Sequence, residues 1–194
     1  MYEIPTTLTV NETQYHIRHD GDYRIVLDCF AALNDAELTE TERVVAALSI
    51  FYDELTVEEI FTFDTDILNE FIGKMFEFFN CGEPEGIAAK TQRKVIDWEQ
   101  DQQMICSGIN KVAGTEVRAL EYLHWWTFMG YFCAIGESTL STVVSIRDKI
   151  LKGKKLEKYE QEFRRDNPNY FVWDSRTIQE KEDDELIKQL WGGE

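Results

Sequence analysis

Few side chains in the sequence have both the type and the spacing that catalysis or metal binding requires. Asp97 and Asp101 are four residues apart, which places two carboxylates on one face of a helix, as a metal site or an acid and base pair would need. His124 precedes Trp125 and Trp126, so it could belong to an aromatic-lined site. Both groups also have a structural explanation, because capping and the helix dipole favour acidic residues in a first turn. A histidine inside an apolar helix is usually held by a structural hydrogen bond, so we favour the structural explanation for both.

Motifs of known enzymes and cofactor sites are missing from the sequence. It has no glycine-rich phosphate loop, no G-x-S-x-G turn, no H-E-x-x-H helix and only three histidines. Cys29, Cys81, Cys106 and Cys133 form no C-x-x-C pair and have no histidine at metal-ligand spacing. We therefore expect reduced thiols in or near the core, no metal, no cofactor and no enzymatic activity.

Negative charge is concentrated in the first half of the chain. Residues 1–86 carry 4 Lys and Arg against 19 Asp and Glu, whereas residues 87–194 carry 16 against 18, for a net charge of −17. Such a surface repels phosphate backbones and anionic lipids, so neither nucleic acid nor membrane is an expected partner. Basic partners remain possible, although a solvated acidic face that maintains solubility is the simpler interpretation.

One basic stretch contrasts with this acidic background. It consists of Arg147, Lys149, Lys152, Lys154, Lys155 and Lys158. Nucleic acid could use it, but few aromatic residues accompany it for base stacking, and Asp148 and Glu157 dilute its charge. The acidic half of the protein itself, or another acidic protein, is the favoured partner of this stretch.

Apolar segments of the sequence indicate whether the protein is expected to enter a membrane or to be secreted. No uninterrupted apolar run approaches the roughly 18 residues that a membrane span needs. The first five residues lack the basic and apolar regions of a secretion signal. We expect the protein to remain in the compartment where it is made.

Apolar periodicity and capping signals predict a mostly helical fold. With 43% hydrophobic residues the chain can form a core, and alternation from Thr7 to Ile17 around Asn11-Glu12 predicts one small hairpin. Helices are expected from Asp20 to Leu33, from Asp64 or Asp66 to Phe79 with a stop at Cys81-Gly82, from Asp97 with Gln100 to Gly114, from near Ser138-Thr139 to Ile150, and from Leu156 to Arg165. Two further helices are expected to start at capping boxes, one formed by Thr39 with Glu42 and one by Thr56 with Glu59.

Residues 117–135 stand out because nearly all of them are apolar or aromatic. A helix that is apolar on all sides is buried, so this segment is predicted to be one helix at the centre of the fold. Trp125, Trp126 and Phe128 should therefore pack in the core.

The expected architecture is a compact helical domain with an N-terminal hairpin, followed by a charged extension. The helical domain should cover residues 1–151 and the helical or loosely ordered extension residues 152–194. Dense charge, with only a small apolar group near the end, makes residues 166–194 the part expected to be loosely ordered.

Four short motifs in this order resemble the bacteriophage gene product fifteen family. They are Phe78-Phe79-Asn80-Cys81-Gly82, Asp97-Trp98-Glu99-Gln100-Asp101, Leu123-His124-Trp125-Trp126-Thr127-Phe128 and Ile146-Arg147. The resemblance covers roughly residues 5–150, and Leu-His-Trp-Trp-x-Phe is its most specific string. The chain departs from the family pattern at Met104-Ile105-Cys106 and at Ala113-Gly114-Thr115-Glu116. The residues taken as the structural motif are Asp97, Trp98, Asp101, Leu123, His124, Trp125, Trp126, Phe128 and Arg147.

The resemblance implies a tail-assembly chaperone, encoded just before the tape-measure gene. Such a protein would bind the tape-measure protein and keep it soluble until the tail tube polymerises around it. A companion tail-assembly protein and further copies of the chain are additional expected partners. The resemblance places the protein in the host cytoplasm and outside the mature virion, and it transfers no catalytic residue.

Two other functions compete with this interpretation. An acidic mimic of DNA could block a host nucleic-acid enzyme, but this would require carboxylates regularly spaced on one surface. A minor structural protein of the virion is the other alternative. Mass spectrometry of purified particles separates that alternative from a chaperone, which should be absent from them.

The expected domain limits can be tested by limited proteolysis. Cleavage should begin between Asp166 and Glu185, because loosely ordered charged segments are cut before packed helices. Mass spectrometry of the early fragments would locate the cuts. Early cleavage within residues 97–150 would contradict the predicted domain.

Overall fold

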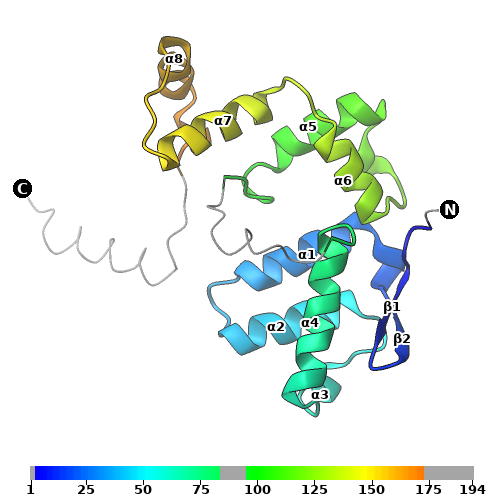
Figure 1. Ribbon diagram of the computed structural model, residues 1–194. Coiled ribbons are helices and arrows are strands. Elements are labelled where there is room, and N and C mark those ends of the chain that lie inside the picture. Colours follow the sequence, from blue (N-terminus) through cyan, green and yellow to red (C-terminus); the bar gives the residue numbers. More distant parts are fainter. Residues whose placement is uncertain (1–2, 84–94, 173–194) are drawn as a thin grey trace, which may run out of the picture.

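The computed structural model describes residues 3–83 and 95–172, and it is mostly helical with one N-terminal hairpin, as predicted (Figure 1). Its elements are β1 (Thr7–Val10), β2 (Thr13–His16), the 3₁₀ turn η1 (Arg18–Gly21), α1 (Tyr23–Asn34), α2 (Glu40–Phe51), α3 (Val57–Ile60), α4 (Thr65–Phe79), α5 (Gln102–Ala113), the 3₁₀ turn η3 (Val117–Ala119), α6 (Trp125–Cys133), α7 (Thr139–Leu151), α8 (Lys158–Asp166) and the 3₁₀ turn η4 (Pro168–Tyr170).

The hairpin is antiparallel and lies against α4. Its two-residue turn, Asn11 and Glu12, has positive φ values of 46° and 63°, which suit the right-handed twist of the strands. The Tyr15 ring meets Phe71 of α4 edge to face at 4.9 Å. A lone hairpin is marginal in water, so this packing is what stabilises it.

Helix starts and stops in the first half follow the predicted capping residues. Thr39 and Glu42 form a reciprocal capping box on α2, and Thr56 and Glu59 form another on α3. Asp64, one of the two candidates, caps α4 by accepting from the Ile67 amide at 2.9 Å.

The predicted stop of α4 is a Schellman ending. The Gly82 amide donates to Glu77 O at 2.8 Å, and the Cys81 amide donates to Phe78 O at 3.0 Å. Both residues have positive φ, 57° for Cys81 and 85° for Gly82. The chain therefore turns sharply away from the helix at this point.

Two predicted helix starts were misplaced. Asp22, and not Asp20, caps α1 by accepting from the Arg24 amide at 3.0 Å, while Asp20 has a left-handed φ of 52°. Asp97 caps a turn, and α5 begins later, at Gln102 after Asp101. In each case the helix begins a few residues after the predicted position, because the predicted aspartate belongs to the turn that precedes the helix.

The single long helix predicted over residues 117–135 was wrong. Residues 117–119 form a 3₁₀ turn, the chain then runs extended to His124, and α6 begins at Trp125. The extended residues pair with the start of α1, where Tyr23 N donates to Leu123 O at 2.9 Å. Apolar composition is therefore no proof of one helix here, because Val117 and Leu123 are buried by neighbouring elements whereas Tyr122 between them is exposed.

Trp125 and Phe128 lie in the core as predicted, each only 1% exposed, whereas Trp126 is half-buried at its edge. Phe128 stacks on Tyr23 of α1 with ring centroids 4.5 Å apart. Trp98 meets Trp125 at 5.7 Å. Aromatic contacts of this kind join α6 to α1 and to the turn before α5.

All four cysteines are free, but only two of them are buried. Cys29 and Cys106 are buried, Cys81 is half-buried, and Cys133 is exposed, contrary to the expectation for that residue. Burial raises the pKa of the Cys29 thiol to about 12, so this side chain behaves as a small core residue. Within the described ranges, no helix has the length and hydrophobicity to cross a membrane.

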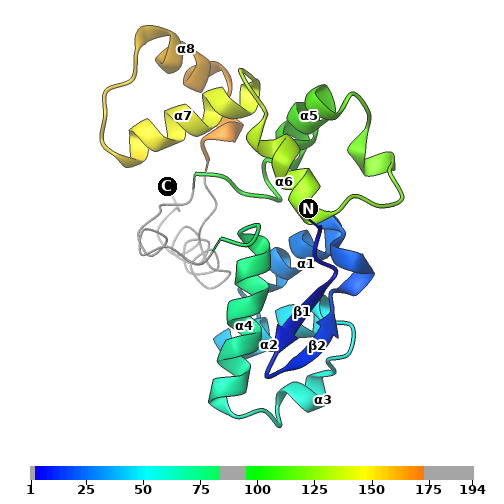
Figure 2. The same cartoon turned by 45° about the vertical axis from the view of Figure 1, so that its right-hand side comes forward.

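The elements form two ends of the molecule with α5 and α6 between them (Figures 1 and 2). The hairpin and α1–α4 form one end, α7 and α8 form the other, and α6 packs on both α1 and α5. Lys149 of α7 bonds Glu160 of α8 at 2.7 Å across the predicted boundary after residue 151. That boundary stays a prediction, and residues 173–194 of the predicted extension lie outside the described residues.

Trp125 and Trp126 differ enough in burial for a matched stability test. Trp125→Ala should lower the free energy of unfolding by about 3–5 kcal/mol, as expected for a buried tryptophan, and Trp126→Ala should lower it less. Denaturant unfolding measures both. Equal losses, or a larger loss for Trp126→Ala, would contradict the position of α6.

Candidate functional site

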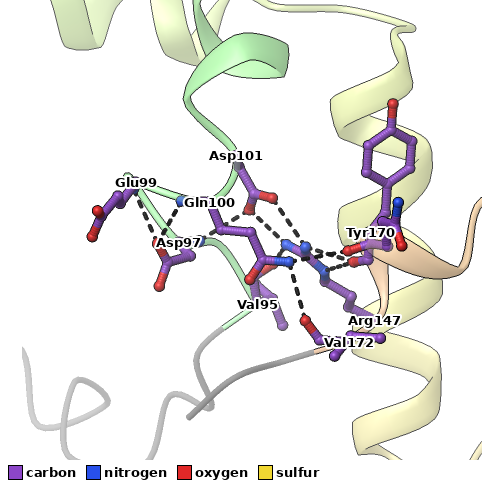
Figure 3. A network of polar contacts seen from close by, with 9 residues as sticks. Val95, Asp97, Glu99, Gln100, Asp101, Arg147, Tyr170 and Val172 are labelled. Carbon is purple, nitrogen blue, oxygen red and sulfur yellow. Dashed lines mark hydrogen bonds and ion pairs between the residues drawn. The ribbon is translucent and has the colours of Figure 1, made fainter.

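Five of the nine motif residues belong to two polar clusters with buried side chains at their centres. The Arg147 cluster consists of Val95, Asp97, Asp101, Arg147 and Tyr170, with Gln100 at its edge (Figure 3). The His124 cluster consists of Pro5, Asp22, Arg24, Leu123 and His124.

Arg147 and Asp101 form a two-pronged ion pair in the interior. Arg147 Nη1 lies 2.6 Å from Asp101 Oδ2, and Arg147 Nη2 lies 2.9 Å from Asp101 Oδ1. Arg147 is 5% exposed and Asp101 is 1% exposed. Because both groups have left water, the pair is stable only if their remaining hydrogen-bonding positions are also filled.

Backbone groups from two other segments, the turn before α5 and the chain after α8, fill those positions. Arg147 donates from Nη2 to Tyr170 O at 2.6 Å and from Nη1 to Val95 O at 3.1 Å. Asp101 Oδ2 also accepts from the Asp97 amide at 3.0 Å. The guanidinium therefore holds the turn before α5, helix α7 and the chain after α8 at one point (Figure 3).

Asp97 and Gln100 complete this arrangement at the surface. Asp97 Oδ1 accepts from the Glu99 amide at 3.0 Å and the Gln100 amide at 2.8 Å. Gln100 Nε2 donates to Val172 O at 3.2 Å. The two carboxylates that could have formed a metal or acid and base pair are thus both engaged by the protein itself. Across residues 3–83 and 95–172, no group of three His, Cys, Asp or Glu side chains could hold a metal ion.

The His124 cluster joins the N-terminal segment to the extended chain before α6. Asp22 caps α1, pairs with Arg24 at 3.0 Å and accepts from the Leu123 amide at 2.9 Å. Arg24 Nη2 donates to Leu120 O at 2.7 Å. One buried carboxylate therefore fixes both the start of α1 and the approach to α6.

His124 is the N-cap of α6 and is held in one tautomer. Its Nδ1 accepts from the Trp126 amide at 3.0 Å, so Nε2 carries the proton and donates to Pro5 O at 3.0 Å. Burial lowers the pKa of His124 from its usual 6.5. Neighbouring Gly21 has φ +78°, and a Cβ there would lie 2.8 Å from the Phe78 ring, so the close approach requires glycine.

The paired tryptophans cap the end of α4. Trp125 Nε1 donates to Phe79 O at 3.0 Å and Trp126 Nε1 donates to Phe78 O at 2.9 Å. These carbonyls belong to the last turn of the helix, which lacks the regular i+4 amide donors, and Phe78 O also accepts from the Cys81 amide. The Phe78-to-Gly82 motif and the Leu-His-Trp-Trp motif are distant in sequence, but these hydrogen bonds bring them into direct contact.

Sequence reasoning singled out the motif residues but missed several of their partners. Asp22, Arg24, Gly21 and the backbone of Tyr170 were not predicted to belong to either cluster. Asp22 gave a weak signal as an acidic residue before an apolar helical pattern, whereas nothing in the sequence marks a carbonyl group that accepts from a distant arginine.

The structure is that of a mostly helical protein with an N-terminal hairpin. The motif side chains of this protein connect its own elements. The chain belongs to the Bacteriophage Gp15 protein family, which it matches over residues 2–171. It is therefore a phage-encoded protein, and the match extends beyond residue 150 to include α8 and η4. No curated protein and no solved structure was found to match it.

The buried ion pair leads to a double-mutant prediction. Arg147→Met should lower the free energy of unfolding by about 3–5 kcal/mol, because it leaves the Asp101 carboxylate buried without its partner. Adding Asp101→Leu should cost much less than a second loss of that size. Denaturant unfolding of the single and double variants gives the coupling energy.

Arg165→Met is a matched control, because Arg165 and Asp166 form an exposed pair whose side chains are 74% and 60% accessible. It should change stability by less than about 1 kcal/mol. Fully additive effects at Asp101 and Arg147 would contradict the direct ion pair.

The neutral state of His124 predicts a pH dependence. Its pKa is lower in the folded protein than the usual 6.5, so its contribution is present above pH 6.5 and is lost as the pH falls through the folded pKa. His124→Asn keeps an N-cap acceptor but cannot titrate, so its stability should change less between about pH 7.5 and pH 5.5.

His16 must be controlled in this experiment because it acts in the opposite direction. Its hydrogen bond to Glu54 raises its pKa above 6.5, so that contribution is present below pH 6.5 and is lost as the pH rises through the folded value. Melting curves should therefore be compared in a His16→Gln background. An unchanged pH slope in His124→Asn would contradict the lowered pKa of His124 in the folded protein.

Proposed function

We propose that the protein is a tail-assembly chaperone that binds the tape-measure protein and keeps it soluble until the tail tube polymerises. The observation that carries this proposal is the Bacteriophage Gp15 family match over residues 2–171, which spans nearly all of the described chain. In this proposal the protein acts in the host cytoplasm, remains absent from the mature virion and has no enzymatic activity.

Exposed apolar side chains support a binding role. Ile4, Tyr122 and Val172 are exposed by 49%, 48% and 63%, although all three are large and apolar. A tape-measure protein is a long helical chain whose apolar stripes would aggregate before the tube covers them. Apolar contacts to such stripes, on a body with a net charge of −17, would keep the complex dispersed.

The use of the motif side chains favours binding over catalysis. Asp101 and Arg147 neutralise each other, and His124 is engaged at both ring nitrogens. These groups organise the protein, so the proposed activity resides on its surface. A companion tail-assembly protein would be a second partner of that surface.

The alternative of a DNA mimic has less support from the placement of the carboxylates. Glu42, Glu59 and Asp64 cap helices, and Glu54 bonds His16. A row of carboxylates that imitates phosphates would need them free and evenly spaced. We therefore retain the chaperone proposal.

Co-expression with fragments of the tape-measure protein tests the proposal. The fragments should move from the pellet to the soluble fraction and co-purify with several copies of the 22.7 kDa protein. Because the contact depends mainly on apolar burial, it should survive about 0.5 M salt, where the Debye length is roughly 4 Å.

Insoluble fragments in the presence of the protein would contradict the chaperone proposal. Dissociation in moderate salt, together with competition against DNA for a host enzyme, would support the mimic. Detection of the protein in purified particles by mass spectrometry would support a virion structural role.

A further inference from the structure

The two ends of the molecule carry opposite charge beside exposed apolar side chains. One end is formed by α3 and the turn into α4, and the other by α7, α8 and the loop between them. Figures 1 and 2 place α3 and α8 at opposite ends in both views.

The acidic tip consists of Val57, Glu58, Phe61 and Asp66. Phe61 is 63% and Val57 is 43% exposed, although both are large and apolar. No basic residue lies between Arg43 and Lys74. Within the described residues, Glu58 and Asp66 have no ion-pair partner.

The basic corner consists of Ile150, Lys154, Lys155, Tyr159 and Lys158. Tyr159 is 63% and Ile150 is 37% exposed. All three lysines are exposed, and none of them has an ion-pair partner in the part of the chain that the structure describes. By contrast, Lys149 and Lys152, which flank the corner, are paired, and exposed Glu157 offsets one of the three lysine charges.

We propose that the acidic tip of one copy docks on the basic corner of the next copy, so that the protein associates head to tail. Opposite charges attract across this contact, and the exposed apolar side chains on both patches are buried by it. The tip cannot reach the corner of its own chain, because the two patches lie at opposite ends (Figure 1).

Charge also determines the symmetry of the association. Two acidic tips repel each other, and so do two basic corners, so a two-fold dimer through either patch is disfavoured. A contact between unlike patches leaves one free tip and one free corner, and copies can then add at both ends. The product is an open row of copies.

Head-to-tail association would serve the proposed function, and only the biological use of the association rests on that function. A row of copies would match a very long partner, in which each copy covers a short length of the tape-measure helix. The self-association itself is a property of the free protein. It can therefore be tested without the tape-measure protein, and either proposal can fail alone.

Sedimentation velocity of the full chain at low salt is the first measurement. The wild-type mass should rise continuously between about 10 µM and about 500 µM and fall when salt is raised from about 50 mM to about 500 mM. A wild type that stays at 22.7 kDa throughout, or that stops at a dimer, overturns the proposal.

Two variants, each lacking one patch, test the geometry. The corner variant carries Lys154→Gln, Lys155→Gln and Lys158→Gln, and the tip variant carries Glu58→Gln, Phe61→Ser and Asp66→Asn. Each alone should associate about tenfold or more weakly than the wild type, as expected for the loss of several exposed charge contacts. An equimolar mixture should form a 1:1 dimer that grows no further, because it retains one intact tip and one intact corner.

Control variants test whether the loss of exposed charge elsewhere, or misfolding, accounts for weaker association. Lys111→Gln, and Glu37→Gln with Glu40→Gln near the start of α2, remove exposed charges elsewhere and should leave the association unchanged. All variants should keep the wild-type melting temperature. A mixture that remains monomeric overturns the proposal. Binding of duplex DNA by the wild type but not the corner variant, without a rise in mass, would also overturn it.

Discussion

The ion pair between Arg147 and Asp101 is the interaction on which the second half of the fold depends. Two charges removed from water are costly unless they face each other and their other hydrogen-bonding positions are filled. Here the carbonyls of Val95 and Tyr170 and the amide of Asp97 fill them. Folding must therefore bring three separate parts of the chain to one point, because the absence of any one of them leaves a buried polar group unsatisfied.

The first half is connected to the second by a different means, which is hydrogen bonding of side chains to backbone groups distant in sequence. The indoles of Trp125 and Trp126 satisfy carbonyls at the end of α4, and Asp22 satisfies the amide of Leu123. Tryptophan suits this task because its ring fills the core while its N–H bonds a backbone group. The residues of the family motif thus hold elements of the protein's own fold together.

Local signals in the sequence were sufficient to predict much of the fold. The hairpin and the capping boxes of α2 and α3 depend on residues within a few positions of one another, and all three are confirmed. The mainly helical class is confirmed as well. Residues 117–135 were mistaken for one helix because burial by distant elements and burial within a helix give the same apolar composition.

Partners in the two clusters could not be predicted for a related reason. A carboxylate such as Asp22 is visible in the sequence, but the amide of Leu123 that it accepts from lies 101 positions away and has no sequence signature. Arg147 was recognised as part of a motif, whereas its role depends on the carbonyl of Tyr170, which any residue could supply. Such contacts become visible only when the chain is folded.

The hydrogen bond from His124 to Pro5 spans 119 positions and links nearly the first described residues to the middle of the chain. Translation at roughly 5–20 residues per second separates the synthesis of these two residues by about 6–24 s. Gly21 is made 103 residues before His124, and Phe78 is made 48 residues before Trp126, so the rings that contact them arrive later. Until residue 126 has been made, the end of α4 therefore lacks the indole N–H that Phe78 O accepts in the folded protein.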